Sequence, residues 1–115
     1  VKITNLELKS FLILVLITGF KRILSIFSMT CFGEIDLVAQ KGGELIFVEV
    51  KSRRSTFFGG PLEGITEIKL HRIIKVALTY VREYNWGGPF RIDVIGITWN
   101  ARDGPQIEHL KNVNS

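Results

Sequence analysis

The chain has 115 residues and a formal net charge of +4, with 46% hydrophobic and 23% charged residues. This length suits one hydrophobic core, so we expect residues 1–115 to form a single domain, and the composition excludes a disordered protein. The only cysteine, Cys31, excludes an internal disulfide and is typical of a reducing cytoplasm, while the mild positive charge is compatible with an anionic partner such as nucleic acid.

The first predicted element is a helix over residues 4–17, which Gly19 would end. Its central run, FLILVLITGF at residues 11–20, is strongly apolar. Lys21 and Arg22 interrupt this run before the roughly 20 apolar residues that a membrane-spanning helix needs, and no small-residue cleavage site indicates a signal peptide. We therefore expect a buried helix in a cytoplasmic protein; a membrane-associated or processed segment is the alternative.

Five strands and a second helix are predicted after this segment. The strands cover residues 23–29, 33–40, 44–51, 90–98 and 106–110. The helix covers residues 67–84, with Thr66 as its N-cap and an apolar stripe at helical spacing. Residues 52–64, rich in glycine, are predicted to form a loop. The order α-β-β-β-α-β-β predicts a mixed α/β domain.

Charged residues interrupt the second and third predicted strands. Side chains alternate along a strand, so Glu34 shares a face with Asp36, and Glu49 shares a face with Lys51. A loop of residues 41–44 would set the register so that Asp36 lies opposite Glu49 and Glu34 lies opposite Lys51. The sequence therefore predicts that an acid pair and a lysine meet on one face of a sheet.

Two opposed carboxylates repel each other unless a cation lies between them. A hard divalent ion, Mg²⁺ or Mn²⁺, accepts the oxygen ligands that Asp36 and Glu49 supply, and the Val50 carbonyl can add another. Lys51 is placed to orient a water molecule or to balance the charge of a phosphate. This chemistry is that of phosphodiester hydrolysis; a structural ion cluster is the alternative.

Basic residues lie close to this predicted site in the sequence and on the second helix. They are suited to binding the phosphates of nucleic acid, and solvated charge is the ordinary alternative. The set comprises Arg53, Arg54, Lys69, Arg72 and Lys75. Asp93, in RIDVIGI, is expected instead to pair with Arg91 or a helix lysine.

The spacing of Asp36 and Glu49-Val50-Lys51 resembles the PD-(D/E)xK nuclease motif, without its usual proline. The segments GEIDLVAQ, LIFVEVKSR, FGGP, RIDVIGI and IEHLKN resemble, in this order, the YraN family of endonuclease-like proteins. That family is similar in fold to archaeal Holliday junction resolvases, and the resemblance covers residues 19–112. It implies a restriction-endonuclease-like sheet flanked by helices.

The resemblance also implies roles for individual residues. Asp36 and Glu49 match the metal-binding acids and Lys51 the catalytic lysine. Glu7, on the first predicted helix, matches the position of a further acidic ligand. The chain departs from the family at ILSIFSMTCF, where a polar, arginine-containing strand is usual; this apolar surface suits contact with a second subunit.

Three hypotheses follow. The first is a Mg²⁺- or Mn²⁺-dependent endonuclease acting on DNA, with branched DNA such as Holliday junctions as a candidate substrate and a homodimer as a candidate assembly. The second is a non-catalytic nucleic-acid-binding protein that keeps the nuclease fold. The third is a protein-interaction module that uses the apolar N-terminal surface.

Overall fold

The computed structural model describes residues 22–53, 65–100 and 104–113. Their elements, in chain order, are β1 (Arg22–Thr30), β2 (Gly33–Lys41), β3 (Glu44–Arg53), α2 (Glu67–Glu83), β4 (Phe90–Asn100) and β5 (Gly104–Leu110). The predicted order of five strands and the second helix is confirmed. The predicted first helix, with Glu7, lies outside the described residues.

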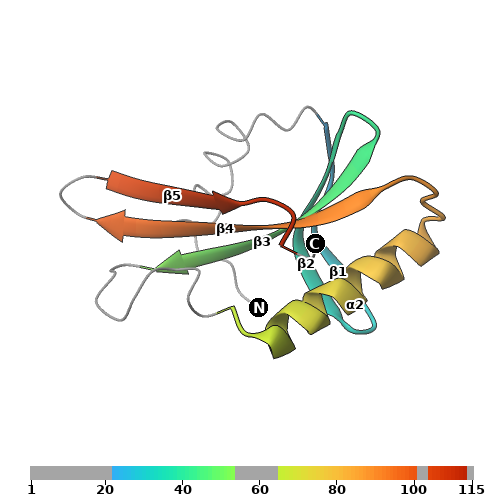
Figure 1. Ribbon diagram of the computed structural model, residues 1–115, viewed down its shortest axis with the longest axis horizontal. Coiled ribbons are helices and arrows are strands. Elements are labelled where there is room, and N and C mark those ends of the chain that lie inside the picture. The colour runs from blue at the N-terminus through green and yellow to red at the C-terminus, as the bar shows by residue number, and fades with distance from the viewer. Residues whose placement is uncertain (1–21, 54–64, 101–103, 114–115) are drawn as a thin grey trace.

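The five strands form one mixed sheet in the order β1-β2-β3-β4-β5. Neighbouring strands are antiparallel except β3 and β4, which are parallel. A parallel pair needs a crossover connection, and α2 lies in the crossover between these two strands. Figure 1 shows α2 running across the sheet at its β1–β2 side, while β4 and β5 extend away from the helix.

The β2–β3 hairpin turns at Gly42 and Gly43. Gly42 has φ of 61°, which places positive φ at the first turn position, as in a type II′ turn. Because Lys41 pairs with Glu44, the turn has two residues rather than the predicted four-residue loop. The predicted register nevertheless holds from this pair to the pair of Leu37 with Val48, where the ladder ends. This register decides which side chains of β2 and β3 share a face.

Helix α2 begins after Thr66, whose Oγ1 accepts a hydrogen bond from the Lys69 N–H at 3.2 Å. The fully buried positions of the helix are Val76, Ala77 and Tyr80. Leu78, which belonged to the predicted apolar stripe, is 46% exposed because it lies about 100° around the helix from Ala77. The helix therefore packs on the sheet through its middle.

Two core clusters cover the two faces of the sheet. The cluster under α2 comprises Ile35, Val38, Leu45, Phe47, Val76, Ala77, Tyr80 and Ile92. The cluster on the opposite face comprises Leu37, Ala39, Ile46, Val48, Ile95 and Ile97. Alternation along β3 thus assigns odd-numbered residues to the α2 face and even-numbered ones to the other.

A buried ion network ties β4 to the C-terminal segment on the face opposite α2. Asp93 is fully buried. Its carboxylate accepts hydrogen bonds from Arg91 Nε at 3.0 Å and Nη2 at 3.2 Å and from the Asn112 N–H at 2.9 Å, and it lies 2.8 Å from His109 Nε2. Arg91 also reaches Glu44 at 3.2 Å. The predicted pairing of Asp93 with Arg91 is confirmed.

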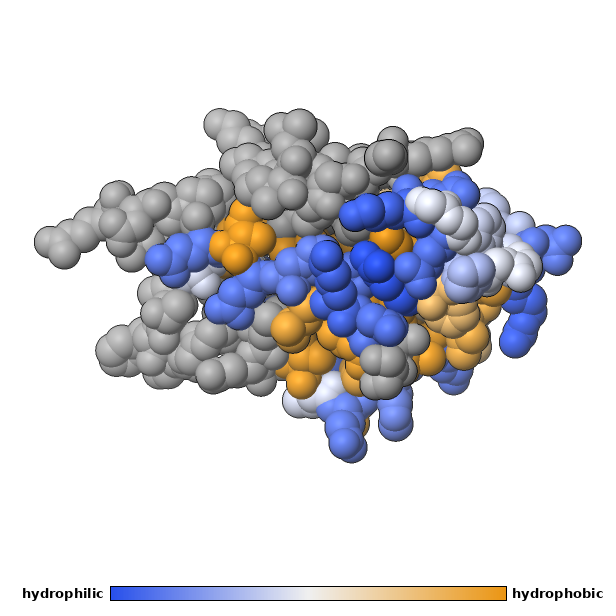
Figure 2. Space-filling view, turned by 45° about the horizontal axis from the view of Figure 1, so that its top comes forward, coloured by the Kyte–Doolittle hydropathy of each residue, from blue (hydrophilic) through white to orange (hydrophobic). Residues whose placement is uncertain are grey.

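The described surface mixes hydrophilic and hydrophobic areas. Figure 2 shows one face on which a hydrophilic band lies among hydrophobic patches. The large hydrophobic side chains left exposed are Leu24, Met29, Phe32, Ile68, Leu78, Tyr84 and Leu110. Among the residues that the structure describes, no helix has the length and apolar character needed to cross a membrane.

Replacing Asp93 by Asn should lower the free energy of unfolding by about 3–5 kcal/mol, because Arg91, His109 and the Asn112 N–H lose the fully buried carboxylate that they share. Glu44→Gln is the control, since the Glu44 side chain is 35% exposed and its pair with Arg91 is worth at most about 1 kcal/mol. Urea denaturation measures both. A loss below about 1 kcal/mol for Asp93→Asn would contradict the assigned role.

Candidate metal centre and phosphate-binding cavity

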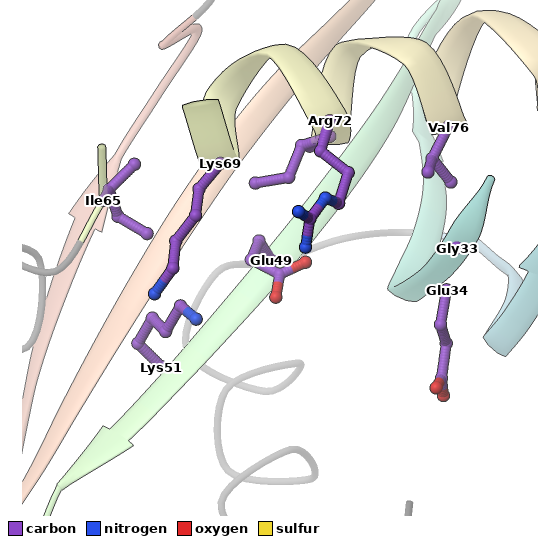
Figure 3. A pocket seen from close by; sticks show the side chains of 9 residues that line it. Gly33, Glu34, Glu49, Lys51, Ile65, Lys69, Arg72 and Val76 are labelled. Carbon is purple, nitrogen blue, oxygen red and sulfur yellow. The ribbon is translucent and has the colours of Figure 1, made fainter. Parts of the chain in front are cut away.

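A cavity of about 150 Å³ lies between α2 and the strands β2 and β3. Its lining comprises Gly33, Glu34, Glu49, Lys51, Ile65, Lys69, Arg72, Ile73 and Val76. Figure 3 shows Glu49 in the middle, Lys51 and Lys69 at one end, and Glu34 at the other. The cavity therefore combines acidic groups from the sheet with basic groups from both the sheet and the helix.

Strand alternation carries Glu49 and Lys51 into this cavity. They continue the α2-facing row of Leu45 and Phe47, whose side chains pack in the core under α2. The core thereby fixes the β3 strand, and its next two α2-facing positions enter the cavity beside the first turns of α2. The prediction that Glu49 and Lys51 share a face is consistent with this arrangement.

Asp36 is not among the residues that line the cavity, but its side chain is held beside β3 by a contact that strand pairing alone does not predict. The backbone ladder of β2 with β3 is continuous from Lys41–Glu44 to Leu37–Val48. Beyond it, the Asp36 carboxylate Oδ2 accepts a hydrogen bond from the Val50 N–H at 2.8 Å. Asp36 therefore takes the place of a backbone acceptor and is held beside β3.

Asp36 and Glu49 form an electrostatically coupled pair. Burial raises the pKa of Glu49 to about 8, the neighbouring Asp36 charge adds to the rise, and Lys51 opposes it. Burial also raises the pKa of Asp36, against the hydrogen bond from Val50. The interaction of the two side chains lowers the pKa of Asp36 and raises that of Glu49 further. Near neutral pH, Glu49 therefore holds a proton that a cation between the two carboxylates would displace.

Basic side chains surround this pair. Lys51 extends from β3 and Lys69 from the first turn of α2 into the same end of the cavity (Figure 3). Arg72, one turn further along the helix, points toward the Glu49 carboxylate (Figure 3). Lys75 is not part of the lining, and its Nζ lies 4.2 Å from the centre of the Phe32 ring. Three of the predicted cations are thus gathered at the cavity.

Glu34 does not lie opposite Lys51 as predicted, and the two do not form an ion pair. Both line the cavity, but the ion pairs among the described residues do not include this one. The physical reason is that the β2–β3 ladder ends at Leu37, so the register no longer holds Glu34 opposite Lys51. Glu34 instead lies at the far end of the cavity from Lys51 (Figure 3).

The donor set fits a hard divalent cation. Asp36 and Glu49 offer carboxylate oxygens whose mutual repulsion a cation would relieve. The Val50 carbonyl points to the same side of β3 as its N–H, toward Asp36, so it can supply a third oxygen. The described residues contain no group of three His, Cys, Asp or Glu side chains placed to hold a metal.

Three other predicted site residues cannot be placed at the cavity. Glu7 and Arg54 lie outside the described residues, and for Arg53 only the backbone, at the end of β3, is described. The sequence analysis also missed Gly33 as a lining residue. Its φ of 145° favours glycine, and a Cβ at this position would lie 3.3 Å from Val76 Cγ2. The glycine that opens GEID at the strand start was the available signal.

The amino-acid sequence is similar to those of other bacterial proteins. The family model described as "Uncharacterised protein family UPF0102" matches residues 18–97. The chain is 40% identical to a UPF0102 protein of Renibacterium salmoninarum over 82 residues, covering 70% of each chain. It is 42% identical to one of Sulfurihydrogenibium over 85 residues, covering 73% of this chain and 70% of that one.

The chain belongs to the UPF0102 family. This confirms the resemblance to YraN proteins. The matched residues 18–97 include Asp36, Glu49, Lys51, Lys69 and Arg72, so the whole acid pair and its cations lie within the UPF0102 region. Membership establishes the family and not a reaction, and the chemistry has to be argued from the cavity.

The stability of the protein should fall as pH rises from about 5 to 8. The ordinary pKa of Glu49 is 4.5 and the folded one about 8, so in this window the folded state binds more protons than the unfolded state. Each such proton contributes a slope of up to about 1.4 kcal/mol per pH unit. Urea denaturation across this range should show a shallower slope for Glu49→Gln and an unchanged one for the exposed Glu83→Gln. Parallel slopes for wild type and Glu49→Gln would contradict the assignment.

Proposed function

We propose that this UPF0102 protein is a metal-dependent nucleic-acid endonuclease that hydrolyses phosphodiester bonds. The observation that carries the proposal is the half-buried Asp36–Glu49 pair, in which Glu49 lines a cavity with Lys51, Lys69 and Arg72. The two carboxylates suit a bound metal ion, and the neighbouring basic side chains suit a phosphate.

Asp36 and Glu49 would hold Mg²⁺ or Mn²⁺ through their carboxylate oxygens, with the Val50 carbonyl beside them and Glu7 as a further candidate ligand. When bound, such an ion activates water and neutralises charge on a phosphodiester. Lys51 donates a hydrogen bond to the attacking water or to a phosphoryl oxygen. Water adds to phosphorus as the bond from phosphorus to the leaving oxygen breaks, and the proton that the water loses is balanced by the one that the leaving oxygen gains from solvent.

The basic groups are assigned to substrate binding. Lys69 and Arg72 face the cavity from α2 and are suited to the phosphates on either side of the scissile one. Lys75 lies one turn beyond Arg72, and Arg53 and Arg54, which follow Lys51 closely in the sequence, are further candidates for phosphate binding. DNA is the proposed substrate, with branched DNA such as a Holliday junction as the preferred form, in the cytoplasm.

The fold proposed is restriction-endonuclease-like. The mixed sheet with a parallel β3–β4 pair and α2 across one face is compatible with it. Symmetric junction cutting needs two active sites, so a homodimer is proposed. The exposed Leu24 and Met29 on the edge strand β1 are candidate contacts in it.

A second candidate function is nucleic-acid binding without catalysis. It is favoured by the proton that Glu49 holds near neutral pH and by the two-acid donor set of the described residues. In that case Lys69, Arg72 and Lys75 still bind phosphates, and affinity falls steeply with salt. Metal binding and turnover separate the two candidates.

Wild-type protein should bind one Mn²⁺, with an affinity that rises from pH 6 to pH 8 as Glu49 loses its proton. Titration calorimetry measures this with and without an oligonucleotide. Asp36→Asn/Glu49→Gln should lose the binding, and Glu83→Gln should keep it. Equal binding by wild type and the double variant would place the ion elsewhere and contradict the site.

Lys51→Ala should reduce cutting of branched DNA in Mg²⁺ by about 100- to 1,000-fold, the loss typical of removing one group that stabilises transition-state charge. Lys41→Ala is the matched control, because Lys41 is exposed beside the distant Gly42–Gly43 turn. Gel assays of folded variants measure both. Unchanged cutting by Lys51→Ala would rule out the proposed mechanism.

A further inference from the structure

The turn between β1 and β2 carries an aromatic side chain that lies outside both core clusters. Cys31 and Phe32 form this turn, and Phe32 is 46% exposed. Phe32 belongs to neither core cluster of the described residues. Polar residues and glycine are usual in such turns, so packing does not account for a phenylalanine here.

The turn holds this ring in a defined place. Thr30 Oγ1 accepts a hydrogen bond from the Phe32 N–H at 3.2 Å and donates one to the Gly33 carbonyl at 3.0 Å. Gly33, with φ of 145°, brings the start of β2 close to Val76 of α2. The Lys75 ammonium lies over the ring, 4.2 Å from its centre, and restrains it further.

Neither Phe32 nor Lys75 lines the cavity, but each is next in sequence to a residue that does. Phe32 immediately precedes Gly33 and Glu34, which line the cavity, and Lys75 immediately precedes Val76, which also lines it. Arg72, one turn before Lys75, faces the cavity from the same helix (Figure 3). A nucleic-acid strand with one phosphate in the cavity would therefore bring a neighbouring nucleotide close to the Phe32 ring and the Lys75 side chain.

An exposed aromatic ring beside phosphate-binding cations is the combination by which proteins hold unpaired nucleotides. Bases stack on the ring, and the backbone is bound by the cations. Paired bases inside a duplex are already stacked on each other and cannot reach such a ring. The same feature thus selects for unpaired or splayed nucleotides.

We propose that Phe32, together with Lys75, forms a stacking subsite for one unpaired nucleobase beside the cavity. The inference rests on the proposed nucleic-acid substrate and specifies its class: DNA with an unpaired nucleotide next to the bound phosphate, as at a branch point or a single-stranded tail. Lys75 binds a flanking phosphate, and Phe32 is a specificity-determining residue.

The test compares a duplex carrying a single-stranded tail with the fully paired duplex, in EDTA so that the result is independent of the metal. A 2-aminopurine in the tail reports stacking by fluorescence quenching. The variants are Phe32→Leu, which keeps an apolar side chain, Phe32→Trp, which keeps an aromatic face, and Tyr84→Leu, which removes an exposed aromatic at the other end of α2.

Phe32→Leu should lose about 5- to 150-fold in affinity for the tailed DNA, the range for one base stacked on an aromatic ring. It should also lose the quenching, and bind the paired duplex like wild type. Phe32→Trp should restore both properties, and Tyr84→Leu should leave them unchanged. An abasic nucleotide in the tail should remove the difference between wild type and Phe32→Leu.

Equal affinity and quenching for wild type and Phe32→Leu on tailed DNA would overturn the stacking subsite and leave the proposed endonuclease untouched. Wild-type protein that binds no DNA would overturn both. Loss of stacking in Phe32→Leu, combined with no cutting by wild type in Mg²⁺, would support the subsite and contradict the catalytic part of the proposed function.

Discussion

The proximity of two half-buried carboxylates at the end of the β2–β3 ladder is the constraint on which the site depends. Where the backbone pairing stops, the Asp36 carboxylate accepts a hydrogen bond from the Val50 N–H and lies next to Glu49. Two such carboxylates repel each other when both are charged. Either a proton on Glu49 or a cation between the pair relieves the repulsion, so pH, metal binding and stability are linked at this point.

Helix α2 has two separate roles along its length. Its middle, at Ala77 and Tyr80, packs on the sheet and holds the helix in place. Its first turns present Lys69 and Arg72 to the cavity. Stability on the other face of the sheet comes from a second core and from the buried Asp93. The groups proposed to bind substrate are therefore not those that hold the core together.

Much of the fold could be predicted from the sequence because each element has a local signal. Alternating apolar residues located the strands, Thr66 located the start of α2, and two glycines located the hairpin turn whose register the structure confirms. The apolar stripe of α2 was predicted less well. Leu78 is as apolar as its neighbours, but it lies on a side of the helix that does not pack on the sheet and is therefore exposed.

The sequence by itself determined that Glu49 and Lys51 share one face of β3 and that a tight turn joins β2 to β3, because side-chain alternation and turn formation are local properties. Only the tertiary structure decided that the ladder ends at Leu37, that Asp36 binds the Val50 N–H, and that Glu34 and Lys51 lie at opposite ends of the cavity. It also decided that Phe32 stands beside Lys75. These contacts join residues distant in the chain, and they depend on how α2 packs across the sheet, which no local pattern specifies.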